Sequence, residues 1–254
     1  MNSVSKALVV GLITFGASLL GMLAQGLVAP DVLAASKPAV GAMAGLIGLL
    51  LALVLGLLVW TSFAVFTGQQ SEAFSLGPII AEIDLLLEQC GPAAKGGRAG
   101  LRAALHNSRK RFFENDATGP QLLTIAEIKT TRAGVNAYFD SVAPADEAQG
   151  RLIQTARGLA LKFQDTQIAM LVRLASPFPP RVVDIVVFWA AILFLGDGLA
   201  ASPNAVTIAA HFIGAVGISS ALFLILELST PYTGYIRLSP LGLDRILQAL
   251  GEPN

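Results

Sequence analysis

The sequence predicts an all-α membrane protein: four transmembrane helices in two hairpins, with a helical cytoplasmic domain inserted between them. Hydrophobic residues make up 54% of the 254 residues and charged residues only 13%, whereas soluble domains carry about 25% charged residues. Four stretches with little or no charge reach the roughly 20 residues that a helix needs to cross a bilayer. The 115 residues from 67 to 181, between the second and third stretches, have ordinary polarity.

Each span is defined by its length and its lack of charge. The predicted spans lie at about residues 7–28, 40–66, 182–199 and 205–228. The first hairpin, the helical domain, the second hairpin and a closing turn with a short helix then occupy residues 1–66, 67–181, 182–228 and 229–254. Residues 1–29 also have the basic start and apolar core of a signal peptide, but the core is too long and no A-x-A cleavage site follows. We therefore expect the first span to be retained.

The positive charges predict the orientation of the spans. Thirteen of the 17 Lys and Arg residues lie between Lys95 and Arg181, and the two short hairpin turns contain only Lys37. Because Lys and Arg are enriched in cytoplasmic loops, we expect both termini and the central domain to be cytoplasmic. The predicted location is the inner (plasma) membrane, with the lipid bilayer as a partner.

The composition and motifs argue against nucleic-acid binding, metal binding and enzyme activity. Seventeen basic and 17 acidic residues cancel, so no overall positive field favours nucleic acid. The single cysteine, Cys90, cannot form an intramolecular disulfide, and the two histidines lie 105 positions apart, without the spacing of a metal site. The sequence shows no nucleotide-binding loop and no carboxylate pair with a nearby base. We expect no enzyme activity, no metal and no cofactor.

Small residues follow one face of the second span. This small-residue stripe is spaced 4, 3, 4 and 4 and consists of Gly41, Gly45, Gly48, Ala52 and Gly56. The fourth span has a shorter series that includes Gly214 and Gly217, whereas the glycines of the first span are five apart and make no single seam. Small residues let membrane helices approach closely. Two interpretations stay open: a tight bundle within one chain, which we favour, or a seam between subunits.

The opposite face of the second span has a different character. It is branched and apolar, then polar toward its cytoplasmic end, and its candidate pore-lining residues are Val54, Leu58, Thr61, Ser62, Val65 and Gln69. An apolar constriction that leads to a polar mouth is one way in which channels gate ions. From these residues alone, a lipid-facing surface with an ordinary interfacial end is the favoured interpretation.

The chain outside the spans is also predicted to be helical. The second span is expected to continue into the cytoplasm, with a break at Gly77-Pro78 as one alternative. Further helices are predicted at about residues 98–113, 121–139, 144–176 and 240–250.

The segment after the fourth span, LELSTPYTGYIRLSP, carries the most specific motif. Its key positions are Glu227, Pro231, Tyr232 and Gly234. With the segments FTGQQSEAFSLGPIIAEIDLLLEQCGP and VFWAAILFLGDGLAASPNAVTIAA, it resembles the bestrophin-like family over about residues 46–251. That family usually has a second Asp and an Arg in this motif, where this chain has Ser229 and Thr230. An acidic and a basic residue are thus lost together, as expected if the two form an ion pair.

The resemblance implies a function. The family is named for a distant similarity to bestrophins, which are oligomeric chloride channels with four spans per subunit and a pore lined by the second span. It therefore implies a homo-oligomer, with a pentamer as one candidate, that conducts inorganic anions. The alternative is a non-conducting membrane scaffold or sensor whose cytoplasmic helices bind a protein partner.

Two ionisable residues of the fourth span have open roles. Glu227 is expected at the aqueous boundary without deep burial, either as part of a structural turn or as a gating residue. In that turn Pro231 would stop the helix, Gly234 would permit the reversal and Tyr232 would anchor at the lipid headgroups. His211 is either functional or a neutral side chain bonded to a neighbouring helix.

Overall fold

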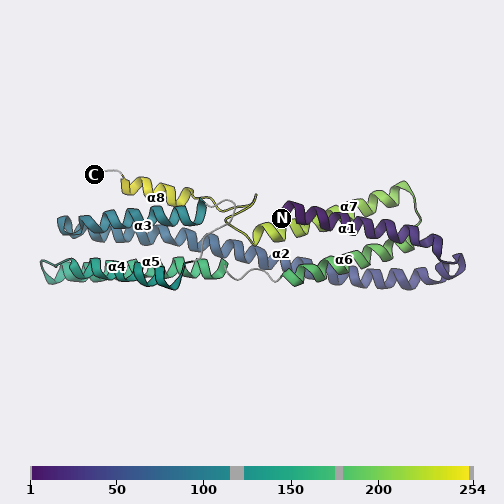
Figure 1. The fold of residues 1–254 in the computed structure, drawn as a ribbon, viewed down its shortest axis with the longest axis horizontal. Helices are drawn as coiled ribbons and strands as arrows, with labels where there is room; N and C mark the ends of the chain where they lie inside the picture. Colours follow the sequence, from purple (N-terminus) through teal and green to yellow (C-terminus); the bar gives the residue numbers. More distant parts are fainter. Residues whose placement is uncertain (1, 115–122, 175–179, 252–254) are drawn as a thin grey trace. The chain divides into compact units, whose positions relative to one another are not determined.

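The computed structural model describes residues 2–114, 123–174 and 180–251, and every regular element in these ranges is helical (Figure 1). The α-helices are α1 (Ser3–Ala24), α2 (Pro30–Gln89), α3 (Lys95–Phe113), α4 (Ile125–Ser141), α5 (Glu147–Leu174), α6 (Pro180–Ala200), α7 (Ala205–Leu228) and α8 (Leu241–Gly251). Two short 3-10 helices, η1 (Gln25–Leu27) and η2 (Gly91–Ala94), follow α1 and α2. α1, α2, α6 and α7 are long and apolar enough to cross a membrane. This confirms the prediction of an all-helical chain with four candidate membrane helices.

The chain forms two compact units. The first, which we term the span unit, comprises residues 1–65 and 177–229. The second, the helical unit, comprises residues 66–176 and 230–254. Because α2 extends from Pro30 to Gln89, its first half belongs to the span unit and its second half to the helical unit.

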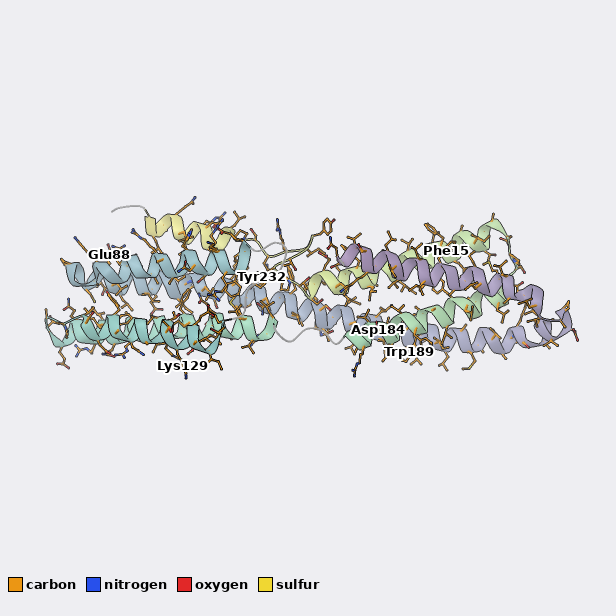
Figure 2. The ribbon with its side chains drawn as sticks, viewed as in Figure 1. Phe15, Glu88, Lys129, Asp184, Trp189 and Tyr232 are labelled. Carbon is orange, nitrogen blue, oxygen red and sulfur yellow. The ribbon has the colours of Figure 1, made fainter. Side chains whose placement is uncertain are left out.

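In the span unit, α1 lies along both α6 and α7 (Figure 1). Phe15 of α1, which Figure 2 labels, makes an edge-to-face contact with Phe212 of α7, with ring centroids 5.6 Å apart. The Ser219 hydroxyl of α7 donates a hydrogen bond of 2.6 Å to the Ala7 carbonyl of α1. The first half of α2 packs through its side chains in a separate cluster, made by Leu51, Leu58, Val186, Ala190 and Ile225. Apolar contacts and a few hydrogen bonds between helices thus hold this unit together.

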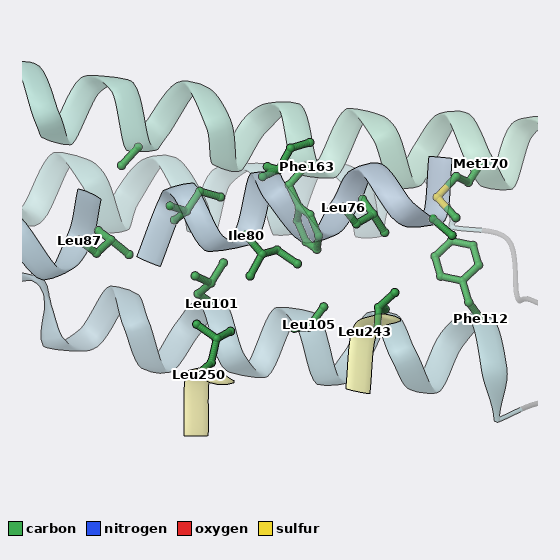
Figure 3. Packing of buried hydrophobic residues seen from close by; sticks show 14 of the residues in the cluster. Leu76, Ile80, Leu87, Leu101, Leu105, Phe112, Phe163, Met170, Leu243 and Leu250 are labelled. Carbon is green, nitrogen blue, oxygen red and sulfur yellow. The ribbon is translucent and has the colours of Figure 1, made fainter. Parts of the chain in front are cut away.

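The helical unit has a larger apolar core around the second half of α2. Leu76 and Ile80 of α2 are at most 1% exposed. The core residues labelled around them in Figure 3 come from α3, α5 and α8 and include Leu105, Phe112, Phe163, Met170, Leu243 and Leu250. Burial of this apolar surface is the main force that orders the unit.

The alternative of a helix break at Gly77-Pro78 is wrong, because α2 continues without interruption to Gln89. Gly77 is buried, and a Cβ atom there would lie 2.6 Å from Cδ1 of Ile246 in α8. This glycine therefore serves the close approach of α8 rather than a bend in α2.

Polar groups fix the helix ends and neighbours of the helical unit. Thr124 and Glu127 form a capping box at the start of α4. This helix was expected from residue 121, but residues 121 and 122 lie outside the described residues. Arg98 of α3 makes a two-pronged ion pair with Asp84 of α2, at 2.7 and 2.8 Å. This pairing, together with those of other arginines, ties α3, α4, α5 and α8 to their neighbours.

Candidate functional site

The second span places its predicted pore residues on different sides. Leu58 is 7% exposed, and Ser62 is fully buried in the span unit. The Ser62 hydroxyl has no hydrogen-bond partner among the described residues. Thr61 and Val65 are exposed and Val54 is half-buried. Within one chain, the six residues therefore do not form a single exposed face.

The sixth residue, Gln69, is an interior amide of the helical unit. It is 1% exposed, its amide nitrogen donates to the Met170 carbonyl at 3.3 Å, and its oxygen accepts from the Tyr232 hydroxyl at 3.1 Å. Both ends of the side chain are thus occupied by contacts that join α2, α5 and the segment after α7.

The small-residue stripe lies mostly outside the packing of its own chain. At Gly41, Gly45 and Gly56, no other described atom lies within 4 Å of where a Cβ would stand. Only Gly48 comes near another helix, with the Leu193 side chain at 3.8 Å from the position of its Cβ. The favoured interpretation, that the stripe closes a bundle within one chain, does not describe these three glycines. In α7, Gly214 packs against Phe194, whereas Gly217 has open space around it.

The closest helix approach in the span unit is between α1 and α6, at positions that sequence reasoning missed. A Cβ at Gly21 would collide with the Leu195 carbonyl oxygen and lie 2.9 Å from the Leu199 amide nitrogen. A Cβ at Gly198 would collide with the Ser18 carbonyl oxygen. We term this contact of Ser18, Gly21, Leu195 and Gly198 the α1–α6 seam. The five-residue spacing of the first-span glycines does not follow one helical face and gave no signal for this contact, which needs only one glycine from each helix.

The motif after α7 forms a turn inside the helical unit. The Thr233 amide donates to the Thr230 carbonyl at 3.1 Å, and the Leu238 amide donates to the Pro231 carbonyl at 2.8 Å. Gly234 has φ +89°, a backbone conformation that only glycine adopts without strain. The predicted need for glycine at this reversal therefore matches the backbone.

Tyr232 does not anchor at lipid headgroups, and that expectation is wrong. Its side chain is 4% exposed, and its ring lies 5.4 Å from Phe112 and 5.5 Å from Phe113, measured between ring centroids. Burial raises the pKa of the hydroxyl, which therefore stays protonated and donates to Gln69. Figure 2 labels Tyr232. The tyrosine of the motif is a core residue that fastens the turn to α2.

The two ionisable residues of α7 differ from expectation in part. Glu227 is 1% exposed in the span unit, so the expectation that it escapes deep burial is wrong. His211 is half-buried, and its Nδ1 lies 2.8 Å from the Thr207 carbonyl oxygen of its own helix. Its ring meets Phe194 of α6 edge-on at 6.1 Å. The hydrogen bond is thus within α7, and the contact with the neighbouring helix is aromatic.

Comparison with known proteins supplies the family. Neither curated proteins nor solved structures gave a match to this chain. The Bestrophin-like domain family matches residues 11–243, a range that includes all four candidate membrane helices in whole or in large part, together with the turn after α7. The chain therefore belongs to the bestrophin-like family.

Proposed function

We propose that this membrane protein is an oligomeric channel for inorganic anions such as chloride, with α2 beside the pore. Family membership supports a channel-type protein. The observation that carries the proposal is the exposed surface of α2 within the span unit. Small side chains and large apolar ones share this surface, and the large ones include Leu46, Leu49, Leu53, Leu57 and Trp60, each at least 53% exposed.

The two flanks of this surface suit two different neighbours. At about 100° per residue, Gly45 and Ala52 fall on one side of the buried line through Leu51 and Leu58, and Thr61 and Val65 on the other. A flank of small residues suits close packing against a helix of another subunit. The flank with Thr61 and Val65 would then line the pore, with half-buried Val54 between them on the same flank. Leu58, Ser62 and Gln69 would support this flank from inside the subunit.

The proposed orientation places the residues between the two hairpins and both termini in the cytoplasm, with the spans in the inner membrane. The concentration of Lys and Arg in residues 95–181 supports it. Basic side chains at a channel mouth also raise the local concentration of anions.

Chloride flux from proteoliposomes tests the proposal, with empty liposomes as the baseline. The matched pair is Val65→Ala and Val9→Ala, because both valines are exposed to a similar degree (42%) and only the first lies on the proposed pore flank. We expect flux from the wild type, altered by Val65→Ala and unchanged by Val9→Ala. No flux at any tested pH or membrane potential would favour the scaffold or sensor. Equal effects of both variants on chloride flux would contradict the proposal that α2 lies beside the pore.

A further inference from the structure

A cavity of about 470 Å³ lies in the helical unit between α3, α4 and α5, with α2 at its base. Protein interiors rarely leave voids larger than a water molecule, and ligand pockets usually measure about 300–1,000 Å³. The volume therefore falls in the range of a binding site.

Small residues on two facing helices create this space. α3 contributes Gly100, Ala103 and Ala104 to the lining, and α4 contributes Gly134. At both Gly100 and Gly134, no described atom lies within 4 Å of where a Cβ would stand. The helices touch instead at one part of the lining itself, where the Tyr138 ring packs directly on Gly97.

The cavity has an apolar floor and an open mouth. Its floor is formed by buried residues of all four helices, which include Ile83, Leu87, Leu101, Phe139 and Phe163. The small residues at the mouth, Gly100, Ala103 and Gly134, are exposed. A molecule with an apolar body can enter through this mouth and cover the floor.

The charged and polar groups of the lining favour a negative end on that molecule. Arg111 is the one charged residue among the described lining residues, and no Asp or Glu is among them. Asn107 and Gln167 bring further N–H donors, and Gln167 also donates to the Ser108 hydroxyl across the α3–α5 boundary. Arginine and amide donors suit a carboxylate or a similar anion.

We propose that this cavity binds a small amphipathic anion, with its apolar body on the floor and its anionic head at Arg111, Asn107 and Gln167. Such a site is separate from the pore proposal, because it lies wholly within the helical unit and requires no conduction. A medium-chain carboxylate is the simplest molecule of this class.

The test uses full-length protein in nanodiscs and a decanoate with a photoactivatable diazirine on its tail. After illumination, peptide mass spectrometry maps the labelled residues. We expect label on floor residues of α3, α4 and α5, competed by unlabelled decanoate much better than by decanol or decylamine. Label confined to the candidate membrane helices would mean partition into the bilayer only and would overturn the proposal.

Variants that fill the cavity provide a second test of the proposal. Gly100→Leu and Gly134→Leu should abolish most of the floor label, because their side chains would occupy the space of the ligand. Gly158→Leu is the control, since Gly158 is exposed on α5, has open space around it and does not line the cavity. Unchanged label in both cavity variants would contradict the proposal. The map obtained with the wild type decides the matter if either variant fails to fold.

The head group is tested with Arg111→Gln. Loss of a charge-assisted hydrogen bond should make decanoate about tenfold weaker as a competitor, with little change for decanol. Arg102→Gln, at an exposed position of the same helix outside the cavity, is the matched control. Equal losses for both variants would show a general effect of surface charge and would refute the assigned head site.

Discussion

The span unit contains two sets of glycines with opposite outcomes. In the α1–α6 seam, Gly21 and Gly198 let two backbones meet so closely that a single added carbon would collide. In the small-residue stripe of α2, Gly41, Gly45 and Gly56 have open space around them. The glycines that do not follow one helical face are used within the chain, whereas most of the stripe that does follow one face is left on its surface.

Periodic small residues therefore indicate where a membrane helix can be approached closely. They do not indicate whether the neighbour is a helix of the same chain, a helix of another subunit or lipid. Lipid tails are as apolar as leucine, so apolarity does not separate a lipid-facing side from a helix-facing side. A regular stripe suits a long parallel contact, as between identical subunits, whereas one crossing point needs only one or two glycines. Variants at these two sets of glycines, and at two polar contacts of the helical unit, test this packing.

The largest effect is expected at the α1–α6 seam. Gly21→Leu forces α1 and α6 apart, because the new Cβ would collide with the Leu195 carbonyl oxygen. We expect a loss of about 3 kcal/mol or more in the free energy of unfolding, read as a large fall in the thermal midpoint in detergent. Gly16→Leu on the same helix, where the Cβ position is open, should leave the midpoint nearly unchanged. Equal midpoints for the two variants would contradict the seam.

A buried polar contact in the helical unit should have an intermediate effect. Tyr232→Phe removes the donor to Gln69 and leaves a buried amide oxygen unpaired, at a cost of about 1–3 kcal/mol. Tyr138→Phe is the matched variant, because the Tyr138 hydroxyl donates a longer bond of 3.3 Å at a half-buried position. Thermal unfolding of both variants should show the larger fall in the thermal midpoint for Tyr232→Phe. The reverse order would argue against the closing turn as a fixed part of the core.

An exposed cap should have a smaller effect. Thr124→Ala removes the hydroxyl that accepts from the Glu127 amide at the start of α4, a loss of about 1 kcal/mol. The backbone and hydroxyl of Thr124 donate to the Glu127 carboxylate and lower its pKa. Because the folded pKa lies below the unfolded one, this stabilisation is present above the unfolded pKa and fades as pH falls through the folded pKa. The difference between wild type and variant in thermal unfolding should therefore narrow in acid, and a difference that widens would be inconsistent with the capping box.

The helices were predictable because length, apolarity and caps are local properties of the sequence. The four candidate spans and the turn at Gly234 followed from such signals. The neighbour of each face of α2 was not predictable. Its face of small residues and its face of branched residues are both apolar, and either can face lipid or protein. The burial of Tyr232 and the Gln69 contact were also missed, because they join residues 163 positions apart. The cavity at Gly100 and Gly134 is lined by four helices, α2 to α5, and depends on how they pack, which no local sequence pattern indicates.

The smallest effect on the free energy of unfolding is expected in the small-residue stripe. A variant there directly tests whether this stripe of α2 is a contact between subunits. Gly45→Leu has open space for its side chain, so folding stability should change by no more than about 0.5 kcal/mol. Subunit contacts through this face should nevertheless be disrupted by the larger side chain. Native mass spectrometry of protein released from nanodiscs measures this, with Gly16→Leu as control. We expect an oligomer for the wild type and for Gly16→Leu, and smaller species for Gly45→Leu. A monomeric wild type, or an oligomer that Gly45→Leu leaves intact, would contradict it.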